Sequence, residues 1–124
     1  MRIYREWLGR KVMVEIDRVA GCIHPRLEDT VYPIHYGFIP GTRTEAGDAI
    51  EIYVVDDPAS IDPADEFEAE IIAIVHRKEG GADKLVVSVT GKRMSADEVE
   101  TAVEFQEKWF KHDIEVLNPA ILRT

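Results

Sequence analysis

The stretch of sequence that says most about the fold reads Tyr32-Pro33-Ile34-His35-Tyr36-Gly37-Phe38-Ile39-Pro40. It is rich in aromatic residues, which are enriched in β-strands. Pro33 also restricts the residue before it, Tyr32, to extended backbone. We therefore expect residues 31–38 to be extended and a turn-rich loop to follow from Pro40 to Gly47.

The segments on either side of this stretch predict further strands. Upstream, Lys11–Asp17 alternates aliphatic and polar side chains, which predicts a half-buried strand with Glu15 on its polar face. Downstream, the β-branched run at 50–55 and the apolar runs at 68–76 and 84–89 are typical of buried strands. A short glycine-rich loop joins the last two runs, as in a hairpin.

The period of the apolar residues then changes from that of a strand to that of a helix. Ser95-x-x-Glu98 is a capping box, and apolar residues follow it at helical spacing as far as Phe110. About five strands followed by one helix predict a mainly β fold with α, a small β-barrel carrying a long C-terminal helix. The length of the chain is typical of a single domain, which we place over residues 1–124.

The charge of the chain limits its partners. The net charge is -9, from 24 acidic and 15 basic residues, which argues against a nucleic-acid partner. A polyphosphate would meet the same repulsion unless divalent cations bridged it to the acidic side chains. Neither a membrane-spanning stretch nor a signal-peptide core is evident, and Cys22 is the only cysteine. We therefore expect no membrane association and a cytoplasmic location.

Three carboxylates gather where the loop after residue 40 enters the next strand. They are Glu45, Asp48 and Glu51, and carboxylate oxygens are the ligands that hard cations prefer. From composition alone, Glu45 and Asp48 are better explained as residues of an exposed turn. Glu51 is harder to explain in that way, because it interrupts an aliphatic strand.

The opening stretch resembles a conserved segment of the soluble, family I inorganic pyrophosphatases, Tyr-Pro-x-x-Tyr-Gly-(Phe/Tyr)-Ile. In that family Asp-Gly-Asp-Pro-x-Asp follows after a loop, and here the corresponding residues are Ala46-Gly47-Asp48-Ala49-Ile50-Glu51. Val14-Glu15-Ile16, Lys84-Leu85 and the aromatic and basic segment Phe105–Lys111 resemble further family segments in the same order. The resemblance implies a five-stranded OB-like barrel that hydrolyses pyrophosphate, or a related small phosphate compound, with Mg²⁺ or Mn²⁺ as cofactor.

The resemblance also implies roles for particular residues. Asp48 and Tyr36 would be catalytic, with Asp48 assisting deprotonation of the attacking water. Asp48, Glu51 and Glu45 would bind metal. The residues on the substrate side would be Glu15, His24, Arg26, Lys84 and Lys111.

The sequence departs from the family pattern at several of these positions. Ala46 stands at the first of the three motif aspartates and Glu51 at the third. A gapless alignment from Lys84 places Arg77 and Ala82 at two further metal-binding aspartates. Two other readings therefore stay open: a hydrolase of another phosphate compound, and a non-catalytic phosphate-binding or structural homologue.

The end of the predicted helix departs as well. Trp109 and Phe110 replace a phosphate-contacting Tyr-Lys pair, with Lys111 one place on, and the segment between Glu15 and Tyr32 is shorter than in the family. Apolar residues near both ends, Tyr4, Trp7 and 117–122, offer a surface for a homo-oligomer. They are equally suited to covering the domain's own barrel.

Overall fold

The computed structural model describes residues 3–117. Its strands are β1 (Lys11–Arg18), β2 (His35–Ile39), β3 (Ile50–Val54), β4 (Phe67–Arg77), β5 (Lys84–Ser88) and β6 (His112–Val116). The α-helix is α1 (Ala96–Glu107), and two short 3-10 helices are η1 (Arg5–Trp7) and η2 (Pro58–Ser60). Among these residues no helix is long and apolar enough to cross a membrane.

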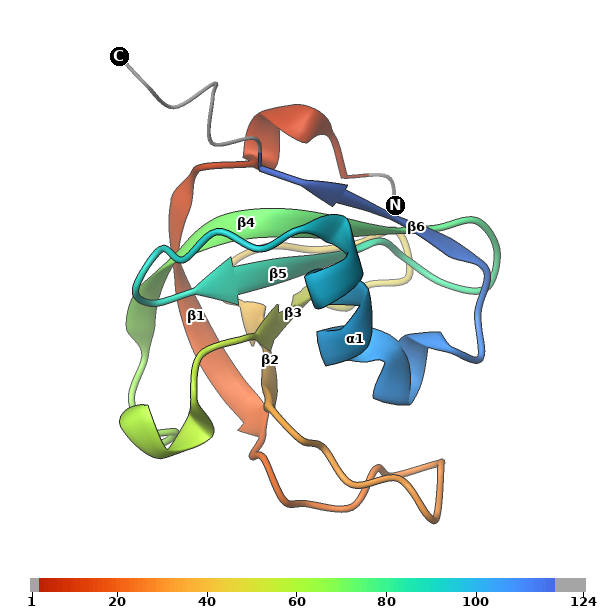
Figure 1. The fold of residues 1–124 in the computed structure, drawn as a ribbon, viewed down its shortest axis with the longest axis horizontal. Helices are drawn as coiled ribbons and strands as arrows, with labels where there is room; N and C mark the ends of the chain where they lie inside the picture. The colour runs from red at the N-terminus through yellow and green to blue at the C-terminus, as the bar shows by residue number, and fades with distance from the viewer. Residues whose placement is uncertain (1–2, 118–124) are drawn as a thin grey trace.

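Five strands close into a barrel in the order β1-β2-β3-β5-β4, because β4 also pairs with β1. The β3–β5 pairing is parallel and the other pairings are antiparallel. The predicted five-stranded barrel with a helix is therefore confirmed. Figure 1 shows α1 lying across one side of the barrel, while β6 runs back along β4.

Alternation along β3 assigns its side chains to two different environments. Ile50, Ile52 and Val54 point into the barrel, where they join a buried aliphatic core. Glu51 and Tyr53 point outward, and Tyr53 is fully buried in a second core between the barrel and α1. This second core includes Val99 and Val103 of the helix. The outer face of β3 thus meets both the helix and the candidate site described below.

Two elements differ from the expectations. The strand β6 was not predicted, and α1 ends at Glu107 rather than at Phe110. The predicted start of the helix is confirmed, because Ser95 Oγ accepts from the Glu98 amide and the Glu98 carboxylate accepts from the Ser95 amide.

The predicted oligomer surface is partly used within the domain. Trp7 packs against the barrel core, and the Arg10 guanidinium carbon lies 4.3 Å from the centre of its ring. Tyr4 is exposed. Of the apolar tail at 117–122, only Leu117 lies within the described residues, and it is buried.

The contact between β1 and β2 requires a glycine. A Cβ on Gly37 would lie 1.8 Å from the backbone oxygen of Glu15, far inside van der Waals contact. The register between these strands shifts between Ile16 and Arg18, which leaves Asp17 as an extra residue on β1. A bulge of this kind redirects the neighbouring side chains, and Asp17 and Arg18 both reach the cleft described next.

Candidate functional site

A cleft of about 590 Å³ lies along the outer face of the barrel, between the strands, three loops and the end of α1. The loops contribute residues 24–27, residues 80–83, and Thr44, Ala46, Asp48 and Ala49 of the loop before β3. Its charged lining residues are Asp17, Asp48, Glu51 and Asp83 together with Arg18, Arg26, Arg77 and Lys84. Four carboxylates therefore face four cationic side chains, so the cleft is balanced although the chain as a whole is acidic.

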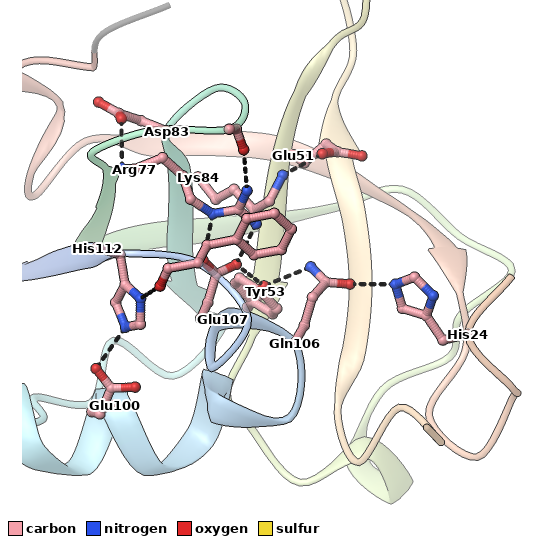
Figure 2. Close-up of polar contacts among 12 residues, drawn as sticks. His24, Glu51, Tyr53, Arg77, Asp83, Lys84, Glu100, Gln106, Glu107 and His112 are labelled. Carbon is pink, nitrogen blue, oxygen red and sulfur yellow. Dashed lines mark hydrogen bonds and ion pairs between the residues drawn. The ribbon is translucent and has the colours of Figure 1, made fainter. Parts of the chain in front are cut away.

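Lys84 is a buried cation in the lining of this cleft. It is 7% exposed, and its Nζ lies 2.5 Å from Glu51 Oε1, as Figure 2 shows. The ammonium also lies 6.0 Å from the centre of the Tyr36 ring. An ammonium has three N–H donors, and Glu51 accepts from one of them. The structure thus brings three sequence-predicted residues, Tyr36, Glu51 and Lys84, into one group.

The hydroxyl of Tyr36 acts as a donor. Burial raises the pKa of Tyr36 well above its ordinary value, and the charge of Glu51 raises it further. The phenol therefore stays protonated at neutral pH. It can donate a hydrogen bond to an anion, but it cannot serve as a base or a nucleophile there.

The loop before β3 presents Asp48 to the cleft but not Glu45. The loop is tightened by a hydrogen bond of 2.6 Å from the Thr44 amide to the Asp48 carbonyl, and the Gly47 amide donates back to the Thr44 carbonyl at 2.9 Å. Asp48 is exposed and lines the cleft, whereas Glu45 is exposed but is not part of the lining.

Glu15 and Asp17 both lie on the outer face of β1, but only Asp17 lines the cleft. The pKa of Glu15 is raised, first by its hydrogen bond with Glu66 and then by burial and by the charges of Glu66 and Asp17. Burial raises the pKa of Asp17, Arg18 opposes this, and Glu51 adds to it. Glu15 is therefore engaged with Glu66, while Asp17 stands beside Glu51.

His24 holds the loop that carries Arg26. Its Nδ1 accepts from the amides of Arg26 at 3.0 Å and Leu27 at 3.1 Å. This assigns the proton to Nε2, which lies 2.9 Å from Gln106 Oε1 on α1. Both ring nitrogens are thus engaged within the protein, and the ring stacks on Tyr32. Arg26 is exposed and lines the cleft, but Lys111 is not part of the lining.

Beneath the cleft runs a buried polar chain that sequence reasoning missed. From the His24 contact, Gln106 Nε2 donates to the Tyr53 hydroxyl at 2.7 Å, and that hydroxyl donates to Glu107. Arg77 completes the chain by donating from Nε to Glu107 Oε1 at 2.5 Å and from Nη2 to Oε2 at 2.9 Å. Figure 2 shows these residues joined from the 24–27 loop to the end of β4.

The buried polar chain contains one positive and one negative side chain, Arg77 and Glu107, which form an ion pair. The side chains of Arg77 and Glu107 are 5% and 0% exposed. Burial alone would raise the pKa of Glu107, but its hydrogen bonds with Arg77 and Tyr53 outweigh this and lower it. The Arg77 guanidinium also stacks on Phe110, 3.8 Å from the ring centre. Where the resemblance implies a metal-binding carboxylate, the structure therefore has a guanidinium ion-paired to α1.

The oxygen donors of the cleft do not fit the resident multi-metal site that the resemblance implies. Within residues 3–117, no group of three or more His, Cys, Asp and Glu side chains is placed to hold an ion. Asp83 is engaged by the amides of Ile3 and Arg77 and by His76. Glu51 forms an ion pair with Lys84. The other two carboxylates of the lining, Asp17 and Asp48, form no ion pair with another residue of 3–117.

The sequence and the fold of this chain are similar to those of known proteins. A family model described as inorganic pyrophosphatase matches residues 8–115. Inorganic pyrophosphatase 1 of Pseudomonas syringae pv. tomato is 33% identical over 88 residues, covering 68% of this chain and 50% of that protein. The inorganic pyrophosphatase of Sulfolobus acidocaldarius is 39% identical over 85 residues, covering 68% and 45%. The chain thus spans about half the length of the curated relatives it matches.

Solved structures agree on the fold. The inorganic pyrophosphatase of Ehrlichia chaffeensis superposes with a TM-score of 0.65 over 88% of this chain and 87% of that one, at 13% identity. The inorganic pyrophosphatase of Helicobacter pylori superposes with a TM-score of 0.57 over 94% of this chain and 89% of that one, at 17% identity.

Proposed function

Because this chain belongs to the inorganic pyrophosphatase family, we propose that its cleft hydrolyses pyrophosphate to two phosphates, with Mg²⁺ or Mn²⁺ entering as part of the substrate complex. The observation that carries the proposal is the Lys84 ammonium, which is buried in the cleft and partnered by Glu51 at 2.5 Å. Burying an ammonium is unfavourable unless it has partners. Its remaining donors are suited to the oxygens of a bound phosphate.

The charge balance of the cleft explains why the divalent ion would come with the substrate. Four carboxylates already offset the four cationic side chains of the lining, so the protein offers little net positive charge to a polyanion. A cation bound to pyrophosphate would supply the missing charge. The free carboxylates of Asp17 and Asp48 would then attract the complex, whereas they would repel pyrophosphate alone.

Four further residues of the cleft lining have a defined part in the proposed reaction. Asp48 accepts the proton of the attacking water, whose oxygen bonds to one phosphorus while the bridging P–O bond breaks. Tyr36, which stays protonated, donates a hydrogen bond to a phosphate oxygen. Arg18 and Arg26 contact the outer phosphate at the rim of the cleft. We place this activity in the cytoplasm, because the single cysteine, Cys22, fits a reducing compartment. We leave nucleic acid out as a partner, because the net charge is -9.

A second function, binding of a phosphate compound without turnover, is favoured by one observation. Arg77 and Ala82 stand where the resemblance implies metal-binding carboxylates, and Arg77 is committed to Glu107. Under this reading Lys84 would still hold a phosphate, but the water would lack activation. Binding of phosphate would then raise the melting temperature without any hydrolysis.

The test measures phosphate release from pyrophosphate with Mg²⁺ and with Mn²⁺. Asp48→Asn is expected to lower kcat by about 10²–10⁴-fold, the range for loss of a general base. Lys84→Met is expected to raise KM, because it removes the buried phosphate ligand. Asp113→Asn is the matched control, since Asp113 is an exposed carboxylate paired with Lys78 away from the cleft.

Two results would contradict the proposal. Absence of release above background with both ions would leave binding without turnover as the function. Full activity of Asp48→Asn would remove Asp48 from the role of base, while circular dichroism confirms that each variant is folded.

A further inference from the structure

The cleft is larger and less polar than pyrophosphate requires. Its volume of about 590 Å³ falls in the range of roughly 300–1,000 Å³ that is typical of pockets for drug-sized ligands. Pyrophosphate is much smaller and entirely polar. Besides the charged residues, the lining includes Pro25, Leu27, Trp109 and Phe110. The lining therefore has apolar surface that a phosphate group alone would leave uncovered.

Two aromatic residues after α1, Trp109 and Phe110, contribute to this apolar surface. Trp109 is 60% exposed and Phe110 is 37% exposed. Exposed large aromatic side chains inside a cleft indicate contact with a ligand more often than isolated apolar residues on a convex surface do. The ring of Phe110 is held from one side by the Arg77 guanidinium. Lys108 Nζ lies 5.1 Å from the centre of the Trp109 ring.

The aromatic residues are connected to the phosphate-binding side of the cleft through the Arg77–Glu107 ion pair and the pairing of β4 with β5. Arg77, at the end of β4, pairs with the buried Glu107, the last residue of α1, which stands two residues before Trp109. Lys84 lies on β5, which pairs with β4 beside Val75, two residues from Arg77. A ligand with a phosphate at Lys84 and a second group at Trp109 would thus bridge two parts of one preorganised surface.

We infer that the cleft takes an organic diphosphate whose planar aromatic group stacks on Trp109, and that a nucleoside diphosphate is the substrate class. This inference rests on the proposed phosphoanhydride hydrolysis and names its substrate. Stacking of a base on an aromatic side chain contributes binding free energy without requiring a particular base. The phosphates complement Lys84, Arg18 and Arg26, and the base complements the exposed indole of Trp109.

The reaction follows the chemistry proposed for pyrophosphate. The oxygen of water bonds to the terminal phosphorus, and the bond from that phosphorus to the bridging oxygen breaks. The nucleoside monophosphate leaves with the bridging oxygen, inorganic phosphate carries the oxygen of water, and one proton is released. Asp48 is placed to accept that proton, as in the proposed function.

The experiment compares ADP, pyrophosphate and geranyl diphosphate as magnesium complexes, with phosphate release as the readout. Trp109→Ala is expected to raise KM for ADP about fivefold or more, since base stacking contributes about 1–3 kcal/mol and 1 kcal/mol is about fivefold. The same substitution should leave KM for pyrophosphate nearly unchanged, because pyrophosphate has no base to stack on Trp109. Trp109→Phe should restore most of the ADP affinity and Trp109→Leu should not. Tyr4→Ala is the control, because Tyr4 is an exposed aromatic residue outside the cleft lining.

A binding measurement separates this inference from the proposed function. The chain has two tryptophans, so ADP should quench the emission of the wild type but leave the Trp7 emission of Trp109→Phe unchanged. If the protein hydrolyses pyrophosphate, but ADP neither quenches the emission nor is hydrolysed, the inference is overturned and the proposed function stands. Hydrolysis of ADP but not of pyrophosphate would support the inferred substrate class and contradict hydrolysis of pyrophosphate. Equal use of geranyl diphosphate and ADP, with Trp109→Leu as active as Trp109→Phe, would overturn the planar substrate class.

Discussion

Replacing Arg77 with methionine tests the buried ion pair beneath the cleft. Both side chains of the pair are almost fully excluded from solvent, and two N–H donors of Arg77 meet the two oxygens of Glu107 at 2.5 and 2.9 Å. Arg77→Met would leave the Glu107 carboxylate buried with the Tyr53 hydroxyl as its remaining side-chain partner. Arg77→Met should therefore lower the free energy of unfolding far more than the loss of an exposed ion pair does.

The magnitude follows from the burial of both groups. Removing one partner of a buried ion pair costs about 3–5 kcal/mol. For a chain of this length each kcal/mol lowers the melting temperature by about 4 °C, so we expect a loss of about 12–20 °C. Replacing both partners, as in Arg77→Met with Glu107→Leu, should cost only about 1–3 kcal/mol, mainly because the Tyr53 hydroxyl loses its acceptor.

The assay is urea unfolding of the wild type, both single variants and the double variant, followed by circular dichroism. Lys78→Met is the matched control, because Lys78 is the next residue of the chain and pairs with Asp113 at 3.2 Å with both side chains more than half exposed. That change should cost less than about 1 kcal/mol. The reasoning fails if Arg77→Met costs no more than Lys78→Met, or if the two single costs simply add in the double variant.

Three further predictions concern the barrel and the helix. Gly37→Ala should prevent folding or lower stability by more than about 3 kcal/mol in urea unfolding, because its Cβ would overlap the Glu15 carbonyl. Gly41→Ala, where a Cβ meets nothing within 4 Å, should cost only about 1 kcal/mol in the same assay, because its φ is positive. Ser95→Ala should cost about 1 kcal/mol in urea unfolding through loss of the helix cap, and an uncapped helix of equal stability would contradict this. Burial lowers the pKa of His112, but hydrogen bonds to a carbonyl and a carboxylate raise it overall above 6.5, so its stabilisation is full below that pH and is lost as pH rises through the folded-state pKa. His112→Gln should therefore lower the melting temperature more at pH 5.5 than at pH 8.5, and an equal loss at both would argue against it.

Most of the barrel could be predicted because its strands carry their own pattern. Alternation along residues 11–17 and the β-branched run at 50–55 both marked strands that the structure contains. The strand β6 could not be found in this way. It has five residues, three of them polar, and it is stabilised by pairing with β4 rather than by its own composition.

The end of α1 shows a second limit of local patterns. Trp109 and Phe110 continue the apolar spacing of the helix, which predicted that it extends that far. In the structure the chain turns after Glu107, and the Phe110 amide donates to the Glu107 carbonyl at 2.9 Å. Phe110 then packs under the Arg77 guanidinium. Arg77 and Phe110 are 33 positions apart in the sequence, so a pattern of neighbouring residues cannot indicate their contact.

The candidate site was predictable where a charged residue interrupts a strand. Glu51 stood out for that reason, and the structure places it beside Lys84 and Tyr36. The Arg77–Glu107 pair gave no comparable signal, because each residue is unremarkable in its own segment. The assignments of Asp48 as base and of Glu45, Asp48 and Glu51 as metal ligands stay predictions, to be decided by the assays above.

The arrangement of β4 has a consequence for how the domain opens. One edge of β4 pairs first with β1, over Phe67–Glu70, and then with β6, over Ala73–Arg77, while the other edge pairs with β5. The amides of Ala73–Val75 therefore have a strand on both sides. Fraying of either end of the chain can strip β1 or β6 from β4, but the amides bonded toward β5 stay protected. Their exchange with solvent deuterium should report the global free energy of unfolding, whereas β6 should exchange through smaller, local openings.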